Sequence, residues 1–227
     1  MRTGWRQNTI SRLLPLALLA ACDATSSSAA LTAADAGGDG ALGQCIGVKP
    51  PTSAWTAVAG PQAVTATTAP TVGAAEPAFA LPDFQPQSCG FGATYGLPVA
   101  HGKVTVVALF AGWCGYCVTQ SGKLEELRLE LQKAGYDLEF LTVNKADAVA
   151  NQQALIDQCA FPLLQDSDAV NAWGQMGGQK DDFILYGADG KVADYLPYGG
   201  DRVTALSTHE GYANLKDAII AATTKQP

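Results

Sequence analysis

The chain has 227 residues, of which 48% are hydrophobic, enough for one ordinary domain with a sizeable core and some additional segments. Its formal net charge at pH 7 is -7. Proteins that bind nucleic acids need basic surface to meet the phosphate groups, so this acidic balance argues against a nucleic-acid partner.

The first residues have the pattern of a secretory signal. Arg2, Arg6 and Arg12 precede a short apolar run, residues 13–21, which ends in small side chains. A basic start, a short apolar core and small residues before the cleavage point are typical of such signals. The run is too short to span a bilayer as a permanent helix. We therefore predict that residues 1–21 are a signal peptide.

The signal ends in Leu19-Ala20-Ala21-Cys22, which resembles the lipobox of bacterial lipoproteins, whose cysteine is acylated and becomes the first mature residue. This predicts a lipid anchor at Cys22 on the periplasmic side of a bacterial cell envelope. Ordinary cleavage nearby, with Cys22 an incidental thiol, is the alternative. Acyl chains add membrane affinity for each buried CH₂. Loss of the three arginines leaves 11 basic and 21 acidic residues, near -10, so the anchor would be the main membrane contact.

Residues 22–75 are rich in alanine, threonine, serine, glycine and proline and show no sustained periodicity, which predicts a flexible tether. Cys45 and Trp55 interrupt this composition. They mark either a short segment that docks on the domain or isolated residues, and we favour docking. The folded domain is expected to span residues 76–227.

The central feature of the domain is the sequence from Val104 to Cys117. The run 104–110 is almost continuously apolar, as expected for a strand covered on both faces of a sheet. After Cys117, leucines and alanine recur at spacings of three and four residues, which predicts a helix that ends near Gly135. The motif Trp113-Cys114-Gly115-Tyr116-Cys117 therefore lies at a strand-to-helix turn.

This position predicts an acidic thiol at Cys114. The unpaired N–H groups and the positive dipole of a helix N-terminus would point at its sulfur. Such surroundings lower a thiol pKa from about 8.5 into the range of roughly 3.5–7.5. Cys114 is therefore the predicted nucleophile, and Cys117, one turn further on and more enclosed, is the predicted resolving thiol.

The remaining pattern completes a mixed α/β fold. An edge strand is expected around Pro82, where proline excludes a central strand. The apolar run 138–143 predicts a strand parallel to 104–110, joined to it by the helix in a right-handed crossover. A helix is expected over Asp147–Cys159, with Val149, Leu155, Ile156 and Cys159 facing inward. It is followed by a short apolar segment over Phe161–Leu164, a short helix over Ala169–Met176 and a hairpin of Phe183–Tyr186 and Val192–Leu196. The last helix is expected over 210–222, and a Ser207–Glu210 capping box opens it.

A CxxC motif after the first central strand of such a βαβ pattern predicts a thioredoxin-like redox domain, with a central mixed sheet flanked by helices and the CxxC at the start of the first long helix. Zinc is the competing use of a CxxC, but it requires a second pair of ligands, and His101 and His209 are single. We expect no metal ion and no cofactor. A purely structural role for the motif is the other alternative.

Four segments carry a more specific resemblance: GKVTVVALF at 102–110, SGKLEELRLELQKAG at 121–135, TVN at 142–144 and KDDFILY at 180–186. In this order they are similar to the N-terminal thioredoxin-like domain of the selenoprotein P family. In that family the first member of the redox motif is typically selenocysteine, and Cys114 takes that position here. The family's animal members also carry long tails rich in histidine and selenocysteine, which this chain does not have, so a role in selenium delivery is not transferred.

The chain departs from ordinary thioredoxins at the loop before residues 183–186. Thioredoxins place a cis-proline there, opposite the CxxC, and use it to hold extended peptides; here Lys180 or Asp181 takes that position. This departure favours small oxidants over protein disulfides. Lys180 is expected either to lie near Cys114 and favour its thiolate or to be a solvated loop lysine. Trp113, Tyr116, Asn144, Lys180 and Asp181 are the candidate site-lining residues, although capping of the next helix is the favoured use of Asn144.

Together these features predict a thiol oxidoreductase in which Cys114 attacks a hydroperoxide or a small disulfide, Cys117 closes a disulfide on it, and an external thiol donor restores the pair. A relay that serves a partner envelope protein and a non-catalytic binding lipoprotein are the alternatives. Cys45, Cys89 and Cys159 are odd in number, and any one pair of them is a candidate for a stabilising disulfide. Cys159, on an apolar face, is expected to be a buried small hydrophobe.

Overall fold

The computed structural model describes residues 44–51 and 68–224. The predicted signal peptide, Cys22 and Trp55 lie outside these ranges. No helix within them is both long and apolar enough to pass through a bilayer. In chain order the elements are β1 (Leu81–Pro82), β2 (Thr94–Tyr95), η1 (Leu97–Ala100), β3 (Val104–Phe110), α1 (Gly115–Lys133), β4 (Leu138–Asn144), η2 (Ala146–Asn151), α2 (Gln152–Ile156), β5 (Leu163–Gln165), α3 (Ala172–Met176), β6 (Phe183–Tyr186), β7 (Val192–Leu196) and α4 (His209–Thr224).

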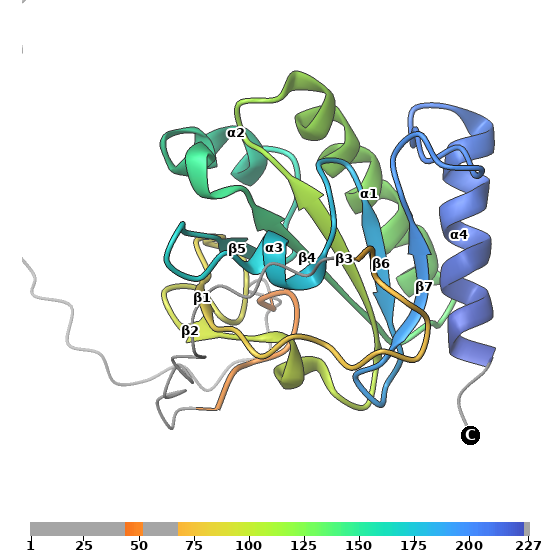
Figure 1. The fold of residues 1–227 in the computed structure, drawn as a ribbon, viewed down its shortest axis with the longest axis horizontal. Coiled ribbons are helices and arrows are strands. Elements are labelled where there is room, and N and C mark those ends of the chain that lie inside the picture. Colours follow the sequence, from red (N-terminus) through yellow and green to blue (C-terminus); the bar gives the residue numbers. More distant parts are fainter. Residues whose placement is uncertain (1–43, 52–67, 225–227) are drawn as a thin grey trace, which may run out of the picture. The chain divides into compact units, whose positions relative to one another are not determined.

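The main sheet has five strands in the order β5-β4-β3-β6-β7 (Figure 1). β3 is the central strand: it pairs in parallel with β4, with Val104 opposite Leu138, and antiparallel with β6, with Thr105 opposite Tyr186. β5 continues the parallel part and β7 the antiparallel part. The predicted mixed sheet, its parallel βαβ pair and the hairpin of β6 and β7 are thus confirmed. β1 and β2 form a separate two-stranded sheet.

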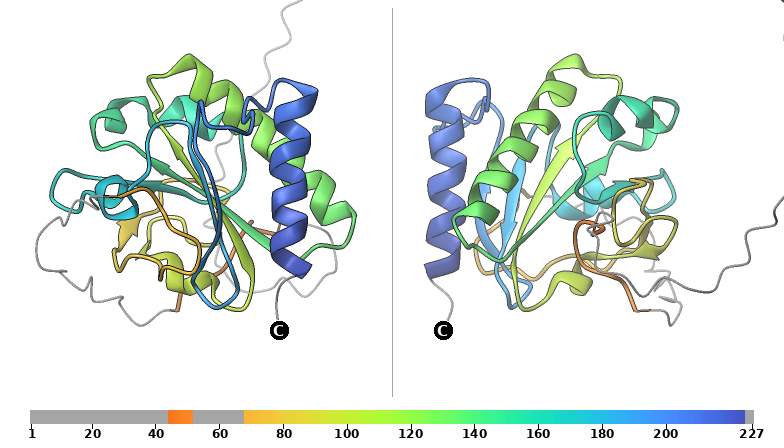
Figure 2. Two further views of the ribbon diagram at one scale, coloured as in Figure 1. Left: turned by 45° about the vertical axis from the view of Figure 1, so that its right-hand side comes forward. Right: turned by 180° about the vertical axis from the view of Figure 1, so that it is seen from behind.

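Both faces of the main sheet are covered, which explains the continuous apolar run of β3. Side chains alternate along a strand, so Val106 and Phe110 point to one face and Val107 and Leu109 to the other. The first face packs against α1, α2 and α4, and the second against α3 and the segments around β1 and β2, as Figure 2 shows from two sides. Every residue of β3 is buried.

The region predicted as one helix over Asp147–Cys159 is instead the 3₁₀ helix η2 followed by the short helix α2. A 3₁₀ helix has three residues per turn rather than 3.6, so the residues that face inward change. Ala148 and Leu155 are fully buried, whereas Val149, expected to face the core, is 59% exposed.

Helix α4 begins where the sequence predicts, but a different side chain caps it. The Thr208 hydroxyl accepts a hydrogen bond from the Gly211 N–H at 3.1 Å, in place of the predicted Ser207. Both residue types are good N-caps. The chain path before α4 decides between them, since Thr208 directly precedes the first helical residue.

A disulfide joins Cys45 to Cys89, the pairing that sequence alone leaves open. Next to it Ile46 forms a bridge with Ser88, and further along Ala75 forms one with Lys191. Two parts of the range predicted as tether are therefore held against the domain. Cys159 is a buried free thiol.

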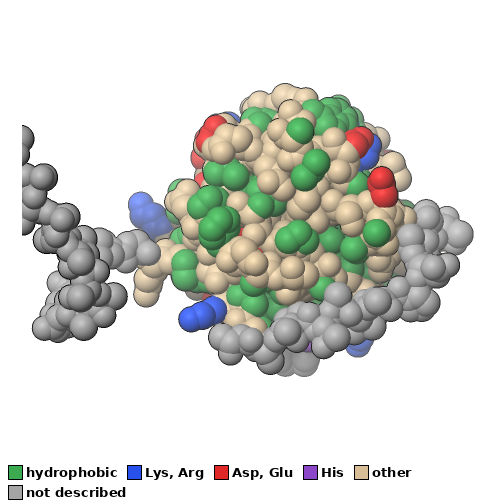
Figure 3. Space-filling model, turned by 90° about the vertical axis from the view of Figure 1, so that its left-hand side faces the viewer, with side chains coloured by type: hydrophobic (Ala, Val, Ile, Leu, Met, Phe, Trp, Pro, Cys, Tyr) green, Lys and Arg blue, Asp and Glu red, His purple; other side chains and the backbone are tan. Residues whose placement is uncertain are grey.

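The surface in view in Figure 3 carries hydrophobic side chains that are scattered among polar ones. Lysine and arginine side chains do not gather there into a basic patch. This distribution agrees with the acidic composition.

Replacing Cys45 and Cys89 together by serine is expected to lower the free energy of unfolding by about 2–4 kcal/mol, because the disulfide closes a loop of 44 residues in the unfolded chain. Urea denaturation without reductant measures the change. The Cys159→Ala variant is a suitable comparison because it removes a thiol without opening a disulfide. An unfolding free energy equal to that of the wild type would contradict a stabilising role for the disulfide.

Candidate redox site

The site begins at the turn between β3 and α1, where Cys114 is the N-cap of the helix. The Cys114 N–H donates to the Ala111 carbonyl at 2.8 Å, and the Cys117 N–H donates to the Cys114 sulfur at 3.4 Å. Gly112 fits this turn because a Cβ there would lie 2.3 Å from the carbonyl oxygen of Asn151. The Cys114 sulfur is thus held at the positive end of a 19-residue helix.

The two sulfurs differ in exposure and in acidity. Cys114 is partly exposed, whereas Cys117 is fully buried. Burial and the negative charge of Asp181 oppose ionisation of Cys114, but hydrogen bonds from Cys117, with a smaller contribution from the Lys180 charge, outweigh them, so the pKa of Cys114 is lowered. Burial raises the pKa of Cys117, and its interaction with the Asp181 carboxylate raises it further. This difference separates an outer nucleophile from an inner thiol.

Lys180 and Asp181 reach the site from the loop before β6. The Lys180 ammonium lies 3.5 Å from the Cys114 sulfur and forms an ion pair with the Asp181 carboxylate. The Asp181 side chain is fully buried. Its backbone has φ 71°, and its N–H donates to the Leu109 carbonyl at 2.8 Å, so the end of β3 holds this loop in place.

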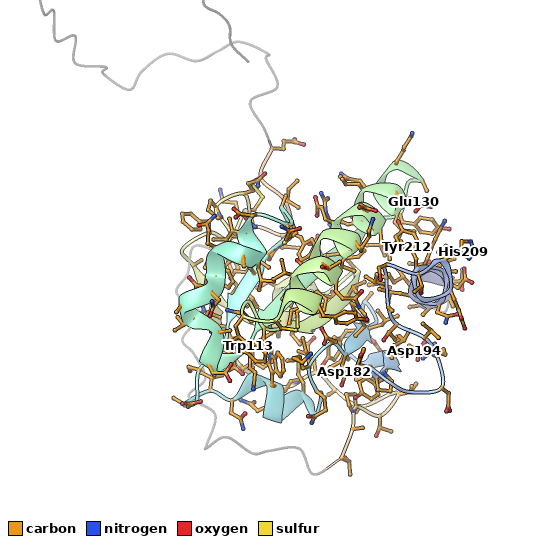
Figure 4. All side chains as sticks on the ribbon, turned by 90° about the horizontal axis from the view of Figure 1, so that it is seen from above. Trp113, Glu130, Asp182, Asp194, His209 and Tyr212 are labelled. Carbon is orange, nitrogen blue, oxygen red and sulfur yellow. A yellow bond between two sulfur atoms is a disulfide. The ribbon has the colours of Figure 1, made fainter. Side chains whose placement is uncertain are left out.

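Asp182 fixes the other side of the same loop. Its buried carboxylate accepts hydrogen bonds from the Gln179 N–H at 2.6 Å, the Tyr195 hydroxyl at 2.5 Å and the Tyr198 N–H at 2.7 Å. The loop is therefore tied to β7 and to the turn that follows it. Figure 4 shows Asp182 and Trp113 at the same end of the molecule, away from Glu130 and Tyr212.

Three aromatic residues belong to the cysteine motif or contact it. Trp113 is 47% exposed; its indole N–H donates to Asp147 at 2.8 Å. Tyr116 packs edge-on against Tyr198, with ring centroids 5.5 Å apart, and Tyr198 itself is 55% exposed. The Lys180 ammonium lies 5.9 Å from the Tyr198 ring. The Lys180 ammonium thus contacts both the Cys114 sulfur and the face of an exposed aromatic ring.

Asn144 lies under the turn rather than at its surface. Its side chain is fully buried, accepts a hydrogen bond from the Gly112 N–H at 2.9 Å and donates to Ala148 and Gln165. It does not cap η2, the use that the sequence favours. Its amide connects the turn before Cys114 to η2 and β5, and these contacts leave it no direct access to a substrate.

Cys114, Cys117 and Asp181 are also the only group of three potential metal ligands within residues 44–51 and 68–224. Their donor atoms lie within 4.8 Å of one another. The Lys180 ammonium contacts two members of this group, and its positive charge would repel a divalent cation. Cys159 lies apart from this chemistry: burial raises the pKa of its thiol to about 12, and the thiol donates to the Leu155 carbonyl.

Comparison with known proteins bears on the part of the chain that holds this site. Residues 94–199 match the family model for the N-terminal region of selenoprotein P. This part of the chain is therefore similar to the N-terminal region of selenoprotein P. Selenoprotein P from Mus musculus is 30% identical over 107 residues, which cover 44% of this chain and 28% of that protein. The Homo sapiens protein is 30% identical over 109 residues, 43% of this chain and 27% of that protein. The chain thus spans less than a third of these relatives.

Solved structures show the same fold at lower identity. A candidate thiol:disulfide interchange protein DsbE from Chlorobium tepidum aligns with a TM-score of 0.51 and 20% identity, over 68% of this chain and 99% of that chain. A candidate thioredoxin from Neisseria meningitidis aligns with a TM-score of 0.51 and 19% identity, over 69% and 93%. The predicted thioredoxin-like fold and the predicted resemblance to selenoprotein P are both confirmed.

The structure adds two residues that the sequence analysis did not single out, Tyr198 and Asp182. Tyr198 follows the hairpin strand β7, its N–H donates to the Asp182 carboxylate, and its ring packs against Tyr116. The one sequence signal for Asp182 was the pair of adjacent aspartates directly before an apolar strand. Acidic side chains that precede buried residues need hydrogen-bond or ionic partners.

Alkylation of the reduced protein with iodoacetamide across pH is expected to show Cys114 reacting with a midpoint below that of a free thiol. Lys180→Met is expected to move this midpoint upward, because it removes the positive charge beside the thiolate. Lys145→Met, which removes an ammonium lying over Trp113 instead, is the matched control. Equal midpoints for wild type and Lys180→Met would show that Lys180 does not stabilise the thiolate.

Proposed function

We propose that this protein is a thiol oxidoreductase that reduces hydroperoxides or small disulfides at Cys114 with electrons from an external thiol donor. The observation that carries the proposal is the placement of two unlike sulfurs. Cys114 is partly exposed beside the Lys180 ammonium at 3.5 Å, and Cys117 is buried one helical turn behind it. An accessible thiolate with a protected second thiol is the arrangement that a two-step thiol reaction requires.

The chemistry balances with these two residues and a thiol donor. With a hydroperoxide, the Cys114 thiolate attacks the outer oxygen and becomes a sulfenic acid, while the alkoxide leaves and takes a proton. The Cys117 sulfur then attacks the Cys114 sulfur, giving a disulfide and water. With a disulfide substrate, a mixed disulfide and one thiol form first. Two equivalents of external thiol reduce the Cys114–Cys117 disulfide and complete the cycle.

The loop before β6 supports small substrates. From the sequence, Lys180 or Asp181 takes the position at which thioredoxins present a cis-proline to extended peptides. Here the Lys180 side chain faces the Cys114 sulfur and the Asp181 side chain is buried. A cation beside the sulfur favours a compact oxidant that accepts electrons as negative charge develops on its leaving group.

We also propose that the protein acts in the cell envelope, on the periplasmic side, held by an acylated Cys22. The Cys45–Cys89 disulfide supports an oxidising compartment, because such bonds persist in secreted and periplasmic proteins. The signal-like sequence of residues 1–21 and the lipobox-like sequence before Cys22 support the anchor.

A thiol–disulfide relay for a protein partner is the second candidate, and one observation favours it. Trp113 and Tyr198 are both about half exposed, flanking the turn that holds Cys114. Exposed aromatic side chains are enriched in protein–protein contact sites. A relay would transfer its disulfide to a partner faster than it consumes hydroperoxide.

Hydroperoxide consumption with dithiothreitol as donor tests the leading proposal. Wild type is expected to turn over and Cys114→Ser to fall to the uncatalysed rate. Cys117→Ser, treated with hydroperoxide before the donor is added, is expected to hold Cys114 as a sulfenic acid and to form no intramolecular disulfide. Cys159→Ala is the control with an intact pair and is expected to keep the wild-type rate. A wild-type rate equal to that of Cys114→Ser would exclude the peroxidase. Measurement of the midpoint potential then separates a relay from an inert staple, since only the staple is strongly reducing and unreactive.

Expression of the full chain in a bacterial host tests the anchor. The wild-type protein is expected in the membrane fraction and to carry acyl chains visible by mass spectrometry, and Cys22→Ala is expected in the soluble periplasmic fraction. Cys45→Ala controls for loss of any N-terminal thiol. An unacylated wild-type protein would show that Cys22 is an ordinary residue near a cleavage site.

A further inference from the structure

A cavity of about 340 Å³ lies at the end of α1 that is remote from the CxxC. Its walls are the segment 44–47, called the strap below, the last turns of α1 and the first residues of β4. Arg128, which lines the cavity, is about 20 Å along the helix from Cys114, since a helix rises about 1.5 Å per residue. Pockets of this size hold small molecules. The cavity is therefore a candidate binding site separate from the redox site.

Four charged side chains line this cavity, and their charges balance. Lys103 and Arg128 are positive, and Asp137 and Glu139 are negative. The Lys103 ammonium lies 2.9 Å from Asp137 and 3.0 Å from Glu139. Arg128 and Glu139 are buried. Buried charges stabilise a fold no better than well-packed apolar side chains, so their presence at this end of the domain favours a role in binding.

The Arg128 guanidinium has hydrogen-bonding capacity to spare. Its Nε and Nη2 groups donate to Glu125 at 2.8 and 2.6 Å, and its Nη1 group donates to Gln132 at 3.1 Å. A guanidinium has five N–H groups, so two are left without a partner among the described residues. Carboxylates are the groups that accept such N–H pairs most strongly. Arg128 is thus suited to hold a ligand carboxylate.

Glu139 supplies the negative side of the cavity. Its carboxylate interacts with the Lys103 ammonium and with the Val48 backbone. Burial nevertheless raises the pKa of Glu139. A second positive partner would therefore stabilise its charged form, and a ligand ammonium is such a partner.

The strap is held in place as a wall of this cavity. Cys45 is bonded to Cys89, and the Ile46 N–H donates to the Gln87 carbonyl at 2.9 Å. Gly47 has φ 85°, and a Cβ there would lie 2.8 Å from Pro162, so only glycine lets the strap pass this close to the domain. A wall fixed before the ligand arrives lowers the entropic cost of binding.

We propose that this cavity binds a small zwitterion, namely a free α-amino acid with an apolar side chain. Its carboxylate pairs with Arg128, its ammonium group pairs with Glu139, and its side chain lies against Ile46 and Leu138, which also line the cavity. A zwitterion keeps the charges of the cavity balanced, whereas a simple anion or cation would leave one charge uncompensated in a partly buried site. The site does not depend on the thiol chemistry proposed above.

Amide chemical shifts of the isotope-labelled protein, measured during addition of L-leucine or L-phenylalanine, test the proposal. Either amino acid is expected to shift signals of the strap and of residues 137–140, with a Kd of about 1 mM or below. N-acetyl-L-leucine lacks the ammonium group and L-leucinamide lacks the carboxylate. Each is expected to bind at least about tenfold more weakly than L-leucine, because half of its charge contacts are lost. Absence of shifts with both amino acids, or equal affinities for leucine and its two analogues, would overturn the proposal.

Two substitutions test the assigned contacts. Arg128→Gln and Glu139→Gln are each expected to weaken L-leucine binding about tenfold or more, since each removes one charge partner. Glu139→Gln is expected to bind N-acetyl-L-leucine no more weakly than wild type does, because that analogue has no ammonium group to lose. Glu130→Gln is the matched control, since Glu130 lies on the same helix but pairs with Lys216 outside the cavity. Equal losses for leucine and N-acetyl-L-leucine in Glu139→Gln would refute the contact between Glu139 and the ammonium group.

A variant that leaves every cavity charge in place tests the location of the site. Replacing Cys45 and Cys89 together by serine removes the covalent hold on the strap, and L-leucine affinity is expected to fall about threefold or more. Cys159→Ala, which leaves this disulfide intact, and Cys114→Ser, at the redox site, are expected to keep the wild-type affinity. An affinity unaffected by loss of the disulfide, or lowered by Cys114→Ser, would show that leucine binds elsewhere and would overturn the assignment.

Discussion

The hydrogen bonds between the end of β3 and the residues before β6 are the constraint on which the site depends. Leu109 accepts from the Asp181 N–H and donates to the Asp182 carbonyl, so both acidic residues are positioned by one residue of the central strand. The same strand ends one residue before the turn that carries Cys114. The relative position of the thiol and of the Lys180–Asp181 pair is therefore set by strand pairing, which is rigid, and only to a small extent by loop packing.

Burial then makes the two acidic residues unequal. Asp182 accepts three hydrogen bonds from the Gln179 and Tyr198 backbone and the Tyr195 hydroxyl, so its carboxylate is fully used in holding the loop. Asp181 instead pairs with the Lys180 ammonium and interacts with the Cys117 thiol. The Asp182 carboxylate therefore holds the loop, whereas the Asp181 carboxylate contributes its charge to the surroundings of the two cysteines. Asp181 and Asp182, although adjacent and of the same type, thus have different roles in the structure.

The sequence predicts those parts of the molecule that depend on local patterns. The apolar run of β3, the helical spacing after Cys117 and the turn of the hairpin each identify their element, because burial on two faces, a 3.6-residue period and positive-φ glycines leave marks in the sequence. The prediction that Val149 faces the core was wrong, and the prediction that Ser207 caps the last helix missed the actual cap, Thr208. Both features depend on the path of the backbone rather than on residue type. The partner of Cys45 and the contact of Tyr198 with Tyr116 are long-range features with no local signal.

In the thiol reaction proposed above, the charges of the site change in a way that favours closure of the Cys114–Cys117 disulfide. In the reduced protein the Lys180 ammonium is shared between the Cys114 thiolate and the Asp181 carboxylate, so two negative groups compete for one cation. In the disulfide form the sulfur carries no charge, and Lys180 and Asp181 form a neutral pair with no competitor. Because the buried carboxylate cannot exchange its counterion with solvent, this relief of competition is intrinsic to the site. The Lys180–Asp181 pair therefore stabilises the Cys114 thiolate less than an isolated lysine would. When the disulfide is closed, however, the positive charge of Lys180 is fully balanced by Asp181.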